Sequence, residues 1–323
     1  MTPPALICPS CHGELISQAT CLYCSPCGKE YPLRDKIPLF APEMDSFYEG
    51  KFTQTHYLYP ETVRRFPVLK SFWRLERMLN INARPYRVLN RLSLPSGGEF
   101  LDLGCGGGTE QFTRLGKVTG YDISLGSLQM ARAVYPEVVQ GNVLQLPFAD
   151  NQFDGVLASH LIGHLPRSEK KIFLKEIIRI LKPGGFLILF AETDADHFLF
   201  RFARQYPDLY QKDFIRRPGH LGLEFLPDLD MLIQSIGYLP VKRVKLYGFL
   251  WAVEHYNHKF SSDYGEQSRF FRGFHSCCRW LASRAFFRET ADVLLGIVAP
   301  LVLGISSDRQ IGEWFLAYQK PEK

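Results

Sequence analysis

The sequence has no stretch of about 18 consecutive apolar residues, the length that a membrane-spanning helix requires. Its first residues, MTPPALICPS, lack the basic start and the long apolar core of a secretory signal peptide. These absences lead us to expect a cytoplasmic protein. Cysteine is scarce beyond the N-terminal region, because five of the eight cysteines fall within the first 27 residues. In a cytoplasmic chain such clustering favours metal ligation over disulfide formation.

The charge balance is only mildly basic, with a formal net charge of +5. This excess permits contact with nucleic acid or an anionic membrane surface but requires neither. Hydrophobic residues make up 46% of the 323 residues and charged residues 22%, which is typical of a folded globular protein. The length suits one large α/β domain together with a small module.

Residues 1–40 contain two CxxC pairs at a spacing typical of zinc modules. Each pair can supply two thiolates from a tight turn to a tetrahedral zinc ion, whose binding would stabilise a segment too short to build its own core. The predicted zinc ligands are Cys8, Cys11, Cys24 and Cys27. Cys21 would then be a spare thiol. The alternative is a redox-active cluster or one that has lost its metal.

From residue 96 onward, short apolar runs alternate with helical patterns. The expected strands lie at residues 100–103, 118–121, 138–140, 153–158, 186–191, 241–247 and 313–319. Helices are expected at 170–181, before the stop signal KPGG, and at 226–236. Strands that alternate with helices predict a doubly wound parallel α/β sheet.

Three regions do not fit the alternation of strands and helices. Residues 41–95 are expected to form a linker and then, over 71–92, a helix in two pieces that is interrupted at Pro85. Residues 193–225 and 248–311 are predicted to be insertions at the rim of the sheet, with a helical cap among them.

A glycine-rich turn follows the first expected strand in the segment EFLDLGCGGG, residues 99–108. A strand that runs into such a turn and then a helix brings the backbone against a nucleotide-like ligand, and glycine leaves room for it. Asp122 ends the second strand, where a carboxylate can accept hydrogen bonds from both ribose hydroxyls. Asn142 follows the third strand and can bond an adenine edge.

Four motifs fall in order along the chain: EFLDLGCGGG, GYDIS, GNVLQLPFADNQFDGVLASHLIGHLP and ILKPGGFLIL. This set resembles the class I S-adenosylmethionine-dependent methyltransferases, and within them the methyltransferase type 11 and ubiquinone/menaquinone-methylating group. The resemblance covers about residues 96–192 and, more weakly, 220–247 and 313–319. It implies a seven-stranded Rossmann-like sheet with S-adenosylmethionine as cofactor. The cofactor-binding residues that it implies are Asp102, Gly104, Gly106, Asp122, Ile123, Asn142, Val143 and Ser159.

Two points of the resemblance concern single residues. Asp102 is implied either to brace the glycine turn or to reach the methionine amino group of the cofactor. Many relatives have aspartate where this chain has Asn142, although asparagine can also serve the adenine. The phrase CSPCGKEYPLRDKIP, residues 24–38, resembles the small zinc-binding Trm112-like domain found in front of some methyltransferases. We therefore predict a Trm112-like module at 1–40 and a methyltransferase domain at 96–323.

Methyl transfer is an in-line displacement at an activated sulfonium, so the protein must mainly hold donor and acceptor in line. A base is needed only where the acceptor must lose a proton. His164 follows the fourth strand, facing the cleft, and is the candidate base or acceptor-orienting group. The alternatives are that it packs against the donor pocket or caps a helix. His220 either points into the acceptor site or braces a loop.

Residues 269–288 contain five arginines and no acid, interleaved with aromatic residues. The next segment, VLLGIVAPLVLGI at 293–305, is thirteen residues long and has no polar side chain. This pattern is typical of an element lying on a membrane surface or of the mouth for a lipid-like acceptor. It also suits RNA binding, or a buried helical pair whose arginines face water.

We predict an S-adenosylmethionine-dependent methyltransferase that acts on a small or lipid-linked acceptor and contacts a membrane peripherally through 269–306. A second hypothesis is an RNA-base methyltransferase that uses the zinc module to position RNA. Against it, the chain has Ser159-His-Leu-Ile where such enzymes carry an NPPY-like tetrad. A third is a non-catalytic scaffold with the same fold, which the intact Gly104, Gly106 and Asp122 disfavour.

Overall fold

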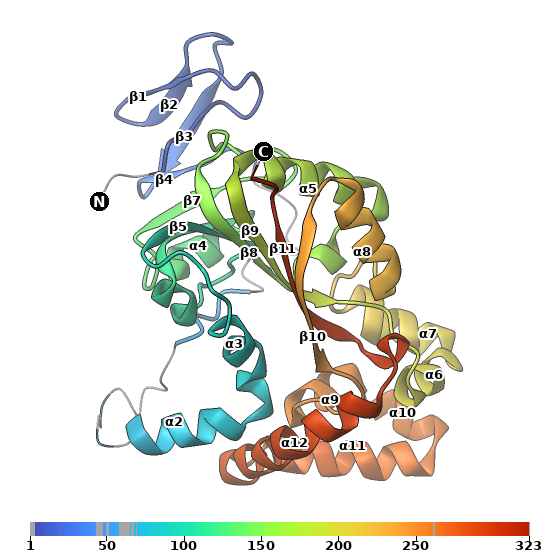
Figure 1. Cartoon of the computed structure of the whole chain (residues 1–323). Coiled ribbons are helices and arrows are strands. Elements are labelled where there is room, and N and C mark those ends of the chain that lie inside the picture. The colour runs from blue at the N-terminus through green and yellow to red at the C-terminus, as the bar shows by residue number, and fades with distance from the viewer. Residues whose placement is uncertain are drawn as a thin grey trace.

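The computed structural model describes residues 4–42, 48–49, 52–57, 65, 68, 70–260 and 262–322. Its centre is a seven-stranded sheet in the order β10–β11–β9–β8–β5–β6–β7 (Figure 1). Neighbours among β5 to β9 pair in parallel, and β11 is antiparallel to both β9 and β10. The strands are β5 (Gly98–Leu103), β6 (Gly116–Asp122), β7 (Glu137–Gln140), β8 (Phe153–Ser159), β9 (Leu181–Glu192), β10 (Leu239–Tyr247) and β11 (Glu313–Gln319). The predicted seven-stranded Rossmann-like sheet is confirmed.

The central strands are apolar along their length because helices cover both faces of the sheet. Val156 and Leu157 of β8 are fully buried, as are Leu187 and Leu189 of β9. Near-continuous hydrophobic runs of this kind are expected of parallel strands with two covered faces. The carboxyl ends of these strands therefore meet at one edge of the sheet, where ligands of open α/β sheets bind.

Helix α5 (Arg167–Ile180) joins β8 to β9 and has apolar residues at helical spacing. Its buried face includes Phe173, Leu174 and Ile177. The stop signal KPGG does end the helix, but the chain enters β9 at once and the signal lies within the strand. Gly184 adopts a φ of +75°, which a residue with a side chain rarely takes.

The helix expected over 71–92 does form in two pieces, α2 (Lys70–Leu79) and α3 (Arg84–Leu89). The break lies at Asn80 rather than at Pro85. Asn80 accepts a hydrogen bond from the backbone N–H of Asn82 at 2.8 Å and so caps a short 3-10 turn. Pro85 lies in the first turn of α3, where its missing N–H costs nothing. Most of the linker predicted before residue 70 lies outside the described residues.

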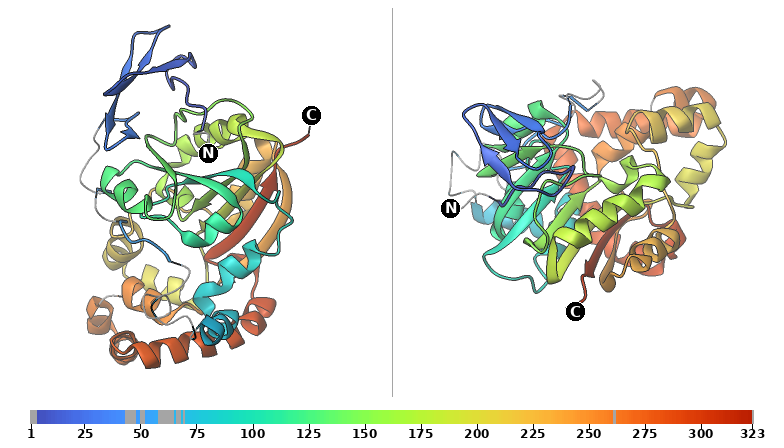
Figure 2. Two further views of the ribbon diagram at one scale, coloured as in Figure 1. Left: turned by 90° about the vertical axis from the view of Figure 1, so that its left-hand side faces the viewer. Right: turned by 90° about the horizontal axis from the view of Figure 1, so that it is seen from above.

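Residues 4–40 form a small four-stranded antiparallel sheet beside β7 (Figures 1 and 2). Its strands are β1 (Leu15–Ser17), β2 (Cys21–Cys24), β3 (Glu30–Arg34) and β4 (Ile37–Pro38). The chain leaving this sheet pairs with the end of β7, because Leu39 forms a parallel bridge with Gln140. Ile37 is 1% exposed and belongs to the core of the large domain. The small sheet is therefore attached at the edge of the large one.

The two predicted insertions are mainly helical and gather at the end of the sheet where β9 ends (Figures 1 and 2). The helices are α6 (Phe198–Arg204), α7 (Pro207–Tyr210), α9 (Val253–Lys259), α10 (Ser262–Gln267), α11 (Arg269–Ala282) and α12 (Ala285–Ile305); α8 (Leu226–Ser235) lies between the insertions in sequence. Stacked and edge-on aromatic rings, such as Phe202 with Phe271, join them. In the described part of the chain, none of the helices combines the length and hydropathy that crossing a bilayer requires.

Candidate functional site

The glycine turn after β5 is tied to the end of β6 through Asp122. One carboxylate oxygen accepts from the backbone N–H of Gly106 at 2.8 Å, and the other accepts from the N–H of Ser124 at 2.9 Å. Burial raises the pKa of Asp122, against the two amide donors that lower it. An ionised carboxylate has about four lone-pair positions. Asp122 therefore keeps acceptor capacity at the carboxyl edge of the sheet, as two ribose hydroxyls require.

Asp102 is connected to the glycine turn through the Tyr135 hydroxyl. Its carboxyl accepts a hydrogen bond from the Tyr135 hydroxyl at 2.7 Å, and that hydroxyl also accepts from the N–H of Thr109 at 2.9 Å. Asp102 is 1% exposed, and burial raises its pKa to about 7. The side chain is thus held inside the protein and links β5 to the far end of the turn.

The loop after β7 presents Asn142 at the surface of the same edge. Its side-chain oxygen accepts from the N–H of Leu144 at 2.9 Å, and its backbone oxygen accepts from the Tyr121 hydroxyl at 3.0 Å. The amide nitrogen is left as a donor, suited to a ring nitrogen of adenine. Ile123 and Val143, the other predicted neighbours, are half-buried in the adjoining loops.

A second backbone segment, residues 52–56, lies directly against the glycine turn. The N–H of Gly107 donates to the oxygen of Phe52 at 2.8 Å, and the N–H of His56 donates to the oxygen of Gly108 at 2.8 Å. A Cβ added at Gly107 would lie 2.3 Å from the oxygen of Thr53. Glycine is therefore needed here for close packing of the chain on itself, a reason that differs from the ligand contact expected from the sequence.

Three side chains converge at the carboxyl ends of β8 and β9. Ligand atoms of His164, Glu192 and His220 all lie within 4.8 Å of one another. His164 Nδ1 lies 3.0 Å from the oxygen of Gly219, so it carries the proton and donates it. The other ring nitrogen, Nε2, is then unprotonated. Burial lowers the pKa of His164, and the neighbouring His220 lowers it further.

His220 is held by its own loop and by Glu192. Its Nδ1 lies 2.8 Å from the oxygen of Phe214, and its Nε2 lies 2.8 Å from the Glu192 carboxylate. Both ring nitrogens therefore face an oxygen acceptor. Burial opposes ionisation of Glu192, but Lys259 and His220 outweigh it and hold its pKa well below the ordinary range.

The cluster extends to His160 and to two residues, Lys259 and Glu313, that sequence reasoning did not single out. Lys259 Nζ lies 3.6 Å from Glu192, and Glu313 at the start of β11 pairs in register with Glu192. Burial raises the pKa of Glu313 to about 7, and its Oε2 has no hydrogen-bond partner among the described residues. His160, whose side chain is 45% exposed, lies 3.8 Å from Glu192. An acid at the end of an apolar strand, as in FLILFAE, is the signal that could have revealed Glu192.

Ser159 lies half-buried at the end of β8, next to His160 and on the edge that holds the cluster. The structure therefore groups the predicted residues in two places. One group lies at the carboxyl ends of β5, β6 and β7 and contains the glycine turn, Asp122 and Asn142. The other lies after β8 and contains His164. Tyr48 and Phe52 approach the His164 ring edge-on, with ring centroids 6.1 and 6.2 Å away. This contact joins the segment over the glycine turn to the histidine cluster.

The four predicted zinc ligands come together in the N-terminal sheet. The sulfur atoms of Cys8 and Cys27 lie 3.6 Å apart, and those of Cys11 and Cys24 lie 3.4 Å apart. Ligands about 2.3 Å from a tetrahedral zinc ion are about 3.8 Å from one another, so the spacing suits the metal. Cys21 donates to Gln18 instead and takes no part in the cluster.

Comparison with known proteins defines the class. The family model described as a methyltransferase domain matches residues 101–189. An O-methyltransferase (resE) of Aspergillus sclerotiorum is 30% identical over 182 residues, which cover 49% of this chain and 68% of the relative. A 2-phytyl-1,4-naphtoquinone methyltransferase of Thermosynechococcus vestitus is 32% identical over 190 residues, which cover 50% of this chain and 81% of the relative. An S-adenosylmethionine-dependent methyltransferase from Methanosarcina mazei, known from a crystal structure, is 17% identical in sequence. The two structures superpose with a TM-score of 0.45 over 73% of this chain and 97% of the other.

A parallel sheet with a glycine turn and an acid at the end of its second strand is the arrangement in which α/β proteins bind nucleotide-like ligands. With the matches above, the chain belongs to the class I S-adenosylmethionine-dependent methyltransferases, in the methyltransferase type 11 group.

Proposed function

We propose that this protein transfers a methyl group from S-adenosylmethionine to a hydroxyl of a small or lipid-linked acceptor by in-line displacement. The observation that carries the proposal is the fixed tautomer of His164 at the carboxyl edge of the sheet. A neutral imidazole with a free Nε2 can take the proton that a hydroxyl loses as it attacks.

The donor would be held by the glycine turn, with the ribose on Asp122 and the adenine near Asn142. When bound, it supplies a methyl group already activated on a sulfonium. The residues present fit it, because Asp122 keeps free lone pairs and Asn142 a free amide donor. The protein's task is then to orient the acceptor and to remove its proton.

His164 is suited to that task at neutral pH. Its lowered pKa keeps the ring neutral, and therefore basic, before the acceptor arrives. Once it has accepted a proton, the nearby Glu192 carboxylate stabilises the imidazolium, because Glu192 raises the pKa of the ring. Burial keeps Glu313 partly protonated near neutral pH, so it can donate a hydrogen bond to an acceptor oxygen.

The acceptor class is proposed from the relatives and from the cap. One relative is named a 2-phytyl-1,4-naphtoquinone methyltransferase, whose acceptor joins a ring to an apolar chain. The helical insertions, residues 193–225 and 248–311, place many aromatic rings beside the cluster. One of them is Phe214, which packs against Lys259 and Phe260. We propose a quinol-like acceptor of this kind, reached from a membrane surface through residues 269–306.

We also propose that residues 1–40 are a zinc module of the Trm112-like kind, with zinc on Cys8, Cys11, Cys24 and Cys27. The sulfur spacing supports this assignment. Residues 41–95 would then link it to a methyltransferase domain at 96–323.

The test is methyl transfer from labelled donor to a reduced naphthoquinone. Replacing the base, His164→Gln, should lower kcat by about 10²- to 10⁴-fold while donor affinity stays within about twofold. His12→Asn is a matched control, because His12 is exposed and its φ of 59° suits asparagine. An unchanged kcat in His164→Gln would remove the base from the mechanism. Label appearing in total RNA, and not in the quinol or a lipid extract, would contradict the acceptor class.

A further inference from the structure

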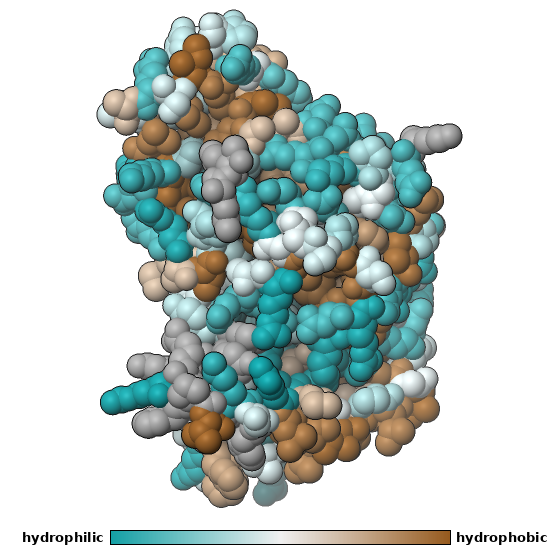
Figure 3. All heavy atoms as spheres, turned by 60° about the vertical axis from the view of Figure 1, so that its left-hand side comes forward, coloured by the Kyte–Doolittle hydropathy of each residue, from teal (hydrophilic) through white to brown (hydrophobic). Residues whose placement is uncertain are grey.

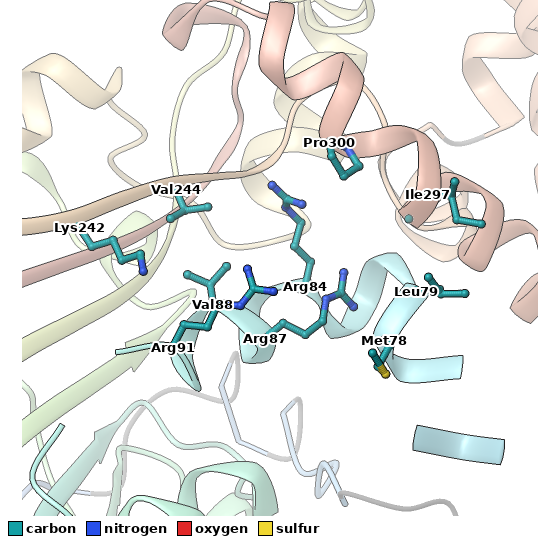
Figure 4. A pocket seen from close by; sticks show the side chains of 11 residues that line it. Met78, Leu79, Arg84, Arg87, Val88, Arg91, Lys242, Val244, Ile297 and Pro300 are labelled. Atoms are coloured by element: carbon teal, nitrogen blue, oxygen red, sulfur yellow. The ribbon is translucent and has the colours of Figure 1, made fainter. Parts of the chain in front are cut away.

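A cavity of about 520 Å³ lies between α2, α3, β10 and α12, and it shares no lining residue with the donor or acceptor site. One side is cationic, with Arg84 and Arg87 on α3, Arg91 just after α3 and Lys242 on β10 (Figure 4). The other side is apolar and includes Met78 of α2 with Ile297 and Pro300 of α12. The cavity therefore matches a ligand with an anionic group next to an apolar one.

The four cations have no carboxylate partner among the described residues. Arg84 donates through Nε and Nη2 to the oxygen of Lys245, and Arg87 donates through Nη1 to the oxygens of Arg77 and Asn80. Each guanidinium has five N–H donors, so both keep donors for a further acceptor. Burial lowers the pKa of Arg87, and Arg84 and Arg91 lower it further. Arg84, Arg87 and Lys242 are half-buried, and uncompensated positive charge of this kind is relieved by binding an anion.

An exposed apolar face of α12 begins at the mouth of this cavity. Ile297 lines the cavity and is 51% exposed, while Leu301 and Ile305, one and two turns further along, are 75% and 88% exposed. Figure 3 shows hydrophobic side chains in a band along the lower edge of the molecule, where Figure 1 places α11 and α12. The exposed apolar residues there include Leu294, Val298, Phe270, Trp280, Phe286 and Phe287.

We propose that this surface docks on a membrane of anionic phospholipid, with one lipid phosphate in the pocket of Arg84, Arg87, Arg91 and Lys242. A bilayer offers apolar chains beside a layer of phosphates, which matches an aliphatic helix face beside free guanidinium groups. RNA fits less well, because single strands are bound by aromatic stacking, and the pocket's apolar side is aliphatic. The proposal adds a phosphate pocket to the membrane contact proposed above, and it does not depend on methyl transfer.

The test is sedimentation of the full chain with vesicles, without donor or acceptor. One set is phosphatidylcholine alone, and the other is equal parts of phosphatidylcholine and phosphatidylglycerol. The variant Arg91→Gln/Lys242→Gln removes two pocket cations that hold no structural hydrogen bond among the described residues. Lys171→Gln/Lys175→Gln, on the exposed side of α5, removes the same charge elsewhere.

The wild type should bind the anionic vesicles more tightly than the neutral ones. The pocket variant should bind them about 30-fold more weakly, since each basic residue near the surface contributes about 1 kcal/mol. The α5 variant should stay within about threefold of the wild type. If both variants lose vesicle binding equally, the pocket assignment is wrong and the binding reflects net charge alone.

Two further measurements separate the sources of the anion. Leu301→Gln/Ile305→Gln should also release the protein from anionic vesicles, and Met231→Gln, at an exposed apolar site on α8, should not. If the pocket variant loses binding of glycerol phosphate but keeps vesicle binding, the site serves a soluble phosphate and the proposal fails. The proposal also fails if the pocket variant loses binding of single-stranded RNA but keeps vesicle binding. Failure of methyl transfer with vesicle binding intact would affect the proposed function alone.

Discussion

At the scale of single residues, the acids of this protein differ mainly in how far they are buried. Asp102 and Asp122 lie near the ends of neighbouring strands, yet Asp102 is buried under the glycine turn and Asp122 is only half-buried. The resemblance implies that both acids belong to the cofactor site, but it leaves two roles open for Asp102. The hydrogen bond from Tyr135, a residue 33 positions away, connects Asp102 to the turn.

Asp102 should make the stability of the protein fall as pH rises. Its pKa in the folded state is about 7, above the value of about 3.9 in an unfolded chain. The folded state therefore holds the proton more tightly, and its contribution to stability is full below pH 4 and is lost as pH rises toward 7. Asp102→Asn, which stays neutral, should flatten this dependence in urea unfolding at pH 5 and pH 8. A parallel pH dependence in wild type and variant would contradict the assignment.

His164 should impose an acidic limb on the rate of methyl transfer. The ring must be neutral to act as a base, and burial places its pKa below the ordinary 6.5. The rate should therefore fall as pH drops through that lowered pKa and should be flat just above neutral pH. The measurement is kcat against pH for the wild type and for Glu192→Gln, which removes a charge that raises the pKa. A limb that does not move to lower pH in the variant would exclude His164 as its origin.

At the scale of elements, the alternation of strands and helices made the sheet predictable, because each parallel strand is a short buried run. Local hydrogen bonding decided the details that the sequence did not reveal. The break between α2 and α3 depends on the cap made by Asn80, and a proline in a first turn does not interrupt a helix. After the glycine turn a 3-10 helix (Glu110–Arg114) replaces the longer helix that such turns usually precede.

Close packing of residues 52–56 on the glycine turn should make Gly107 intolerant of a side chain. Gly107→Ala places a Cβ 2.3 Å from a backbone oxygen, which must move, and should lower the free energy of unfolding by about 1–3 kcal/mol. Gly273→Ala in α11 is the matched control, since nothing lies within 4 Å of its Cβ and alanine favours a helix by about 1 kcal/mol. Urea unfolding gives both values, and an unchanged Gly107→Ala would mean that the segment does not lie there.

Removing the proposed zinc ion should weaken donor binding through the loop after β7. The module bonds to this loop, because the N–H of Ile7 donates to the oxygen of Pro147 at 2.9 Å. Cys11→Ser should lose the metal by elemental analysis and lower affinity for S-adenosylmethionine several-fold. Cys21→Ser should keep both the metal and the affinity for S-adenosylmethionine, since Cys21 lies outside the cluster. Loss of zinc without any change in affinity would show that the module does not support the donor site.

At the scale of the whole molecule, the candidate site is assembled from distant parts of the chain. His164, Glu192, His220, Lys259 and Glu313 come from five different elements or loops. No spacing in the sequence could predict that Glu313 would pair with Glu192, since an antiparallel last strand brings them together across 121 residues. The glycine turn and Asp122 were predictable because they are local to neighbouring strands. The cluster around Glu192 was not, because it depends on how the helical insertions fold over the sheet.

The most direct test of this account is calorimetric titration of the folded protein with S-adenosylmethionine. We expect one binding event per chain. Asp122→Ala should weaken it by about 10- to 100-fold, because the ribose hydroxyls lose a charged acceptor. Asp150→Ala, which removes an exposed acid on a loop, should leave it unchanged. Absence of binding by the folded wild type, or equal affinity in Asp122→Ala, would contradict the assignment of the donor site.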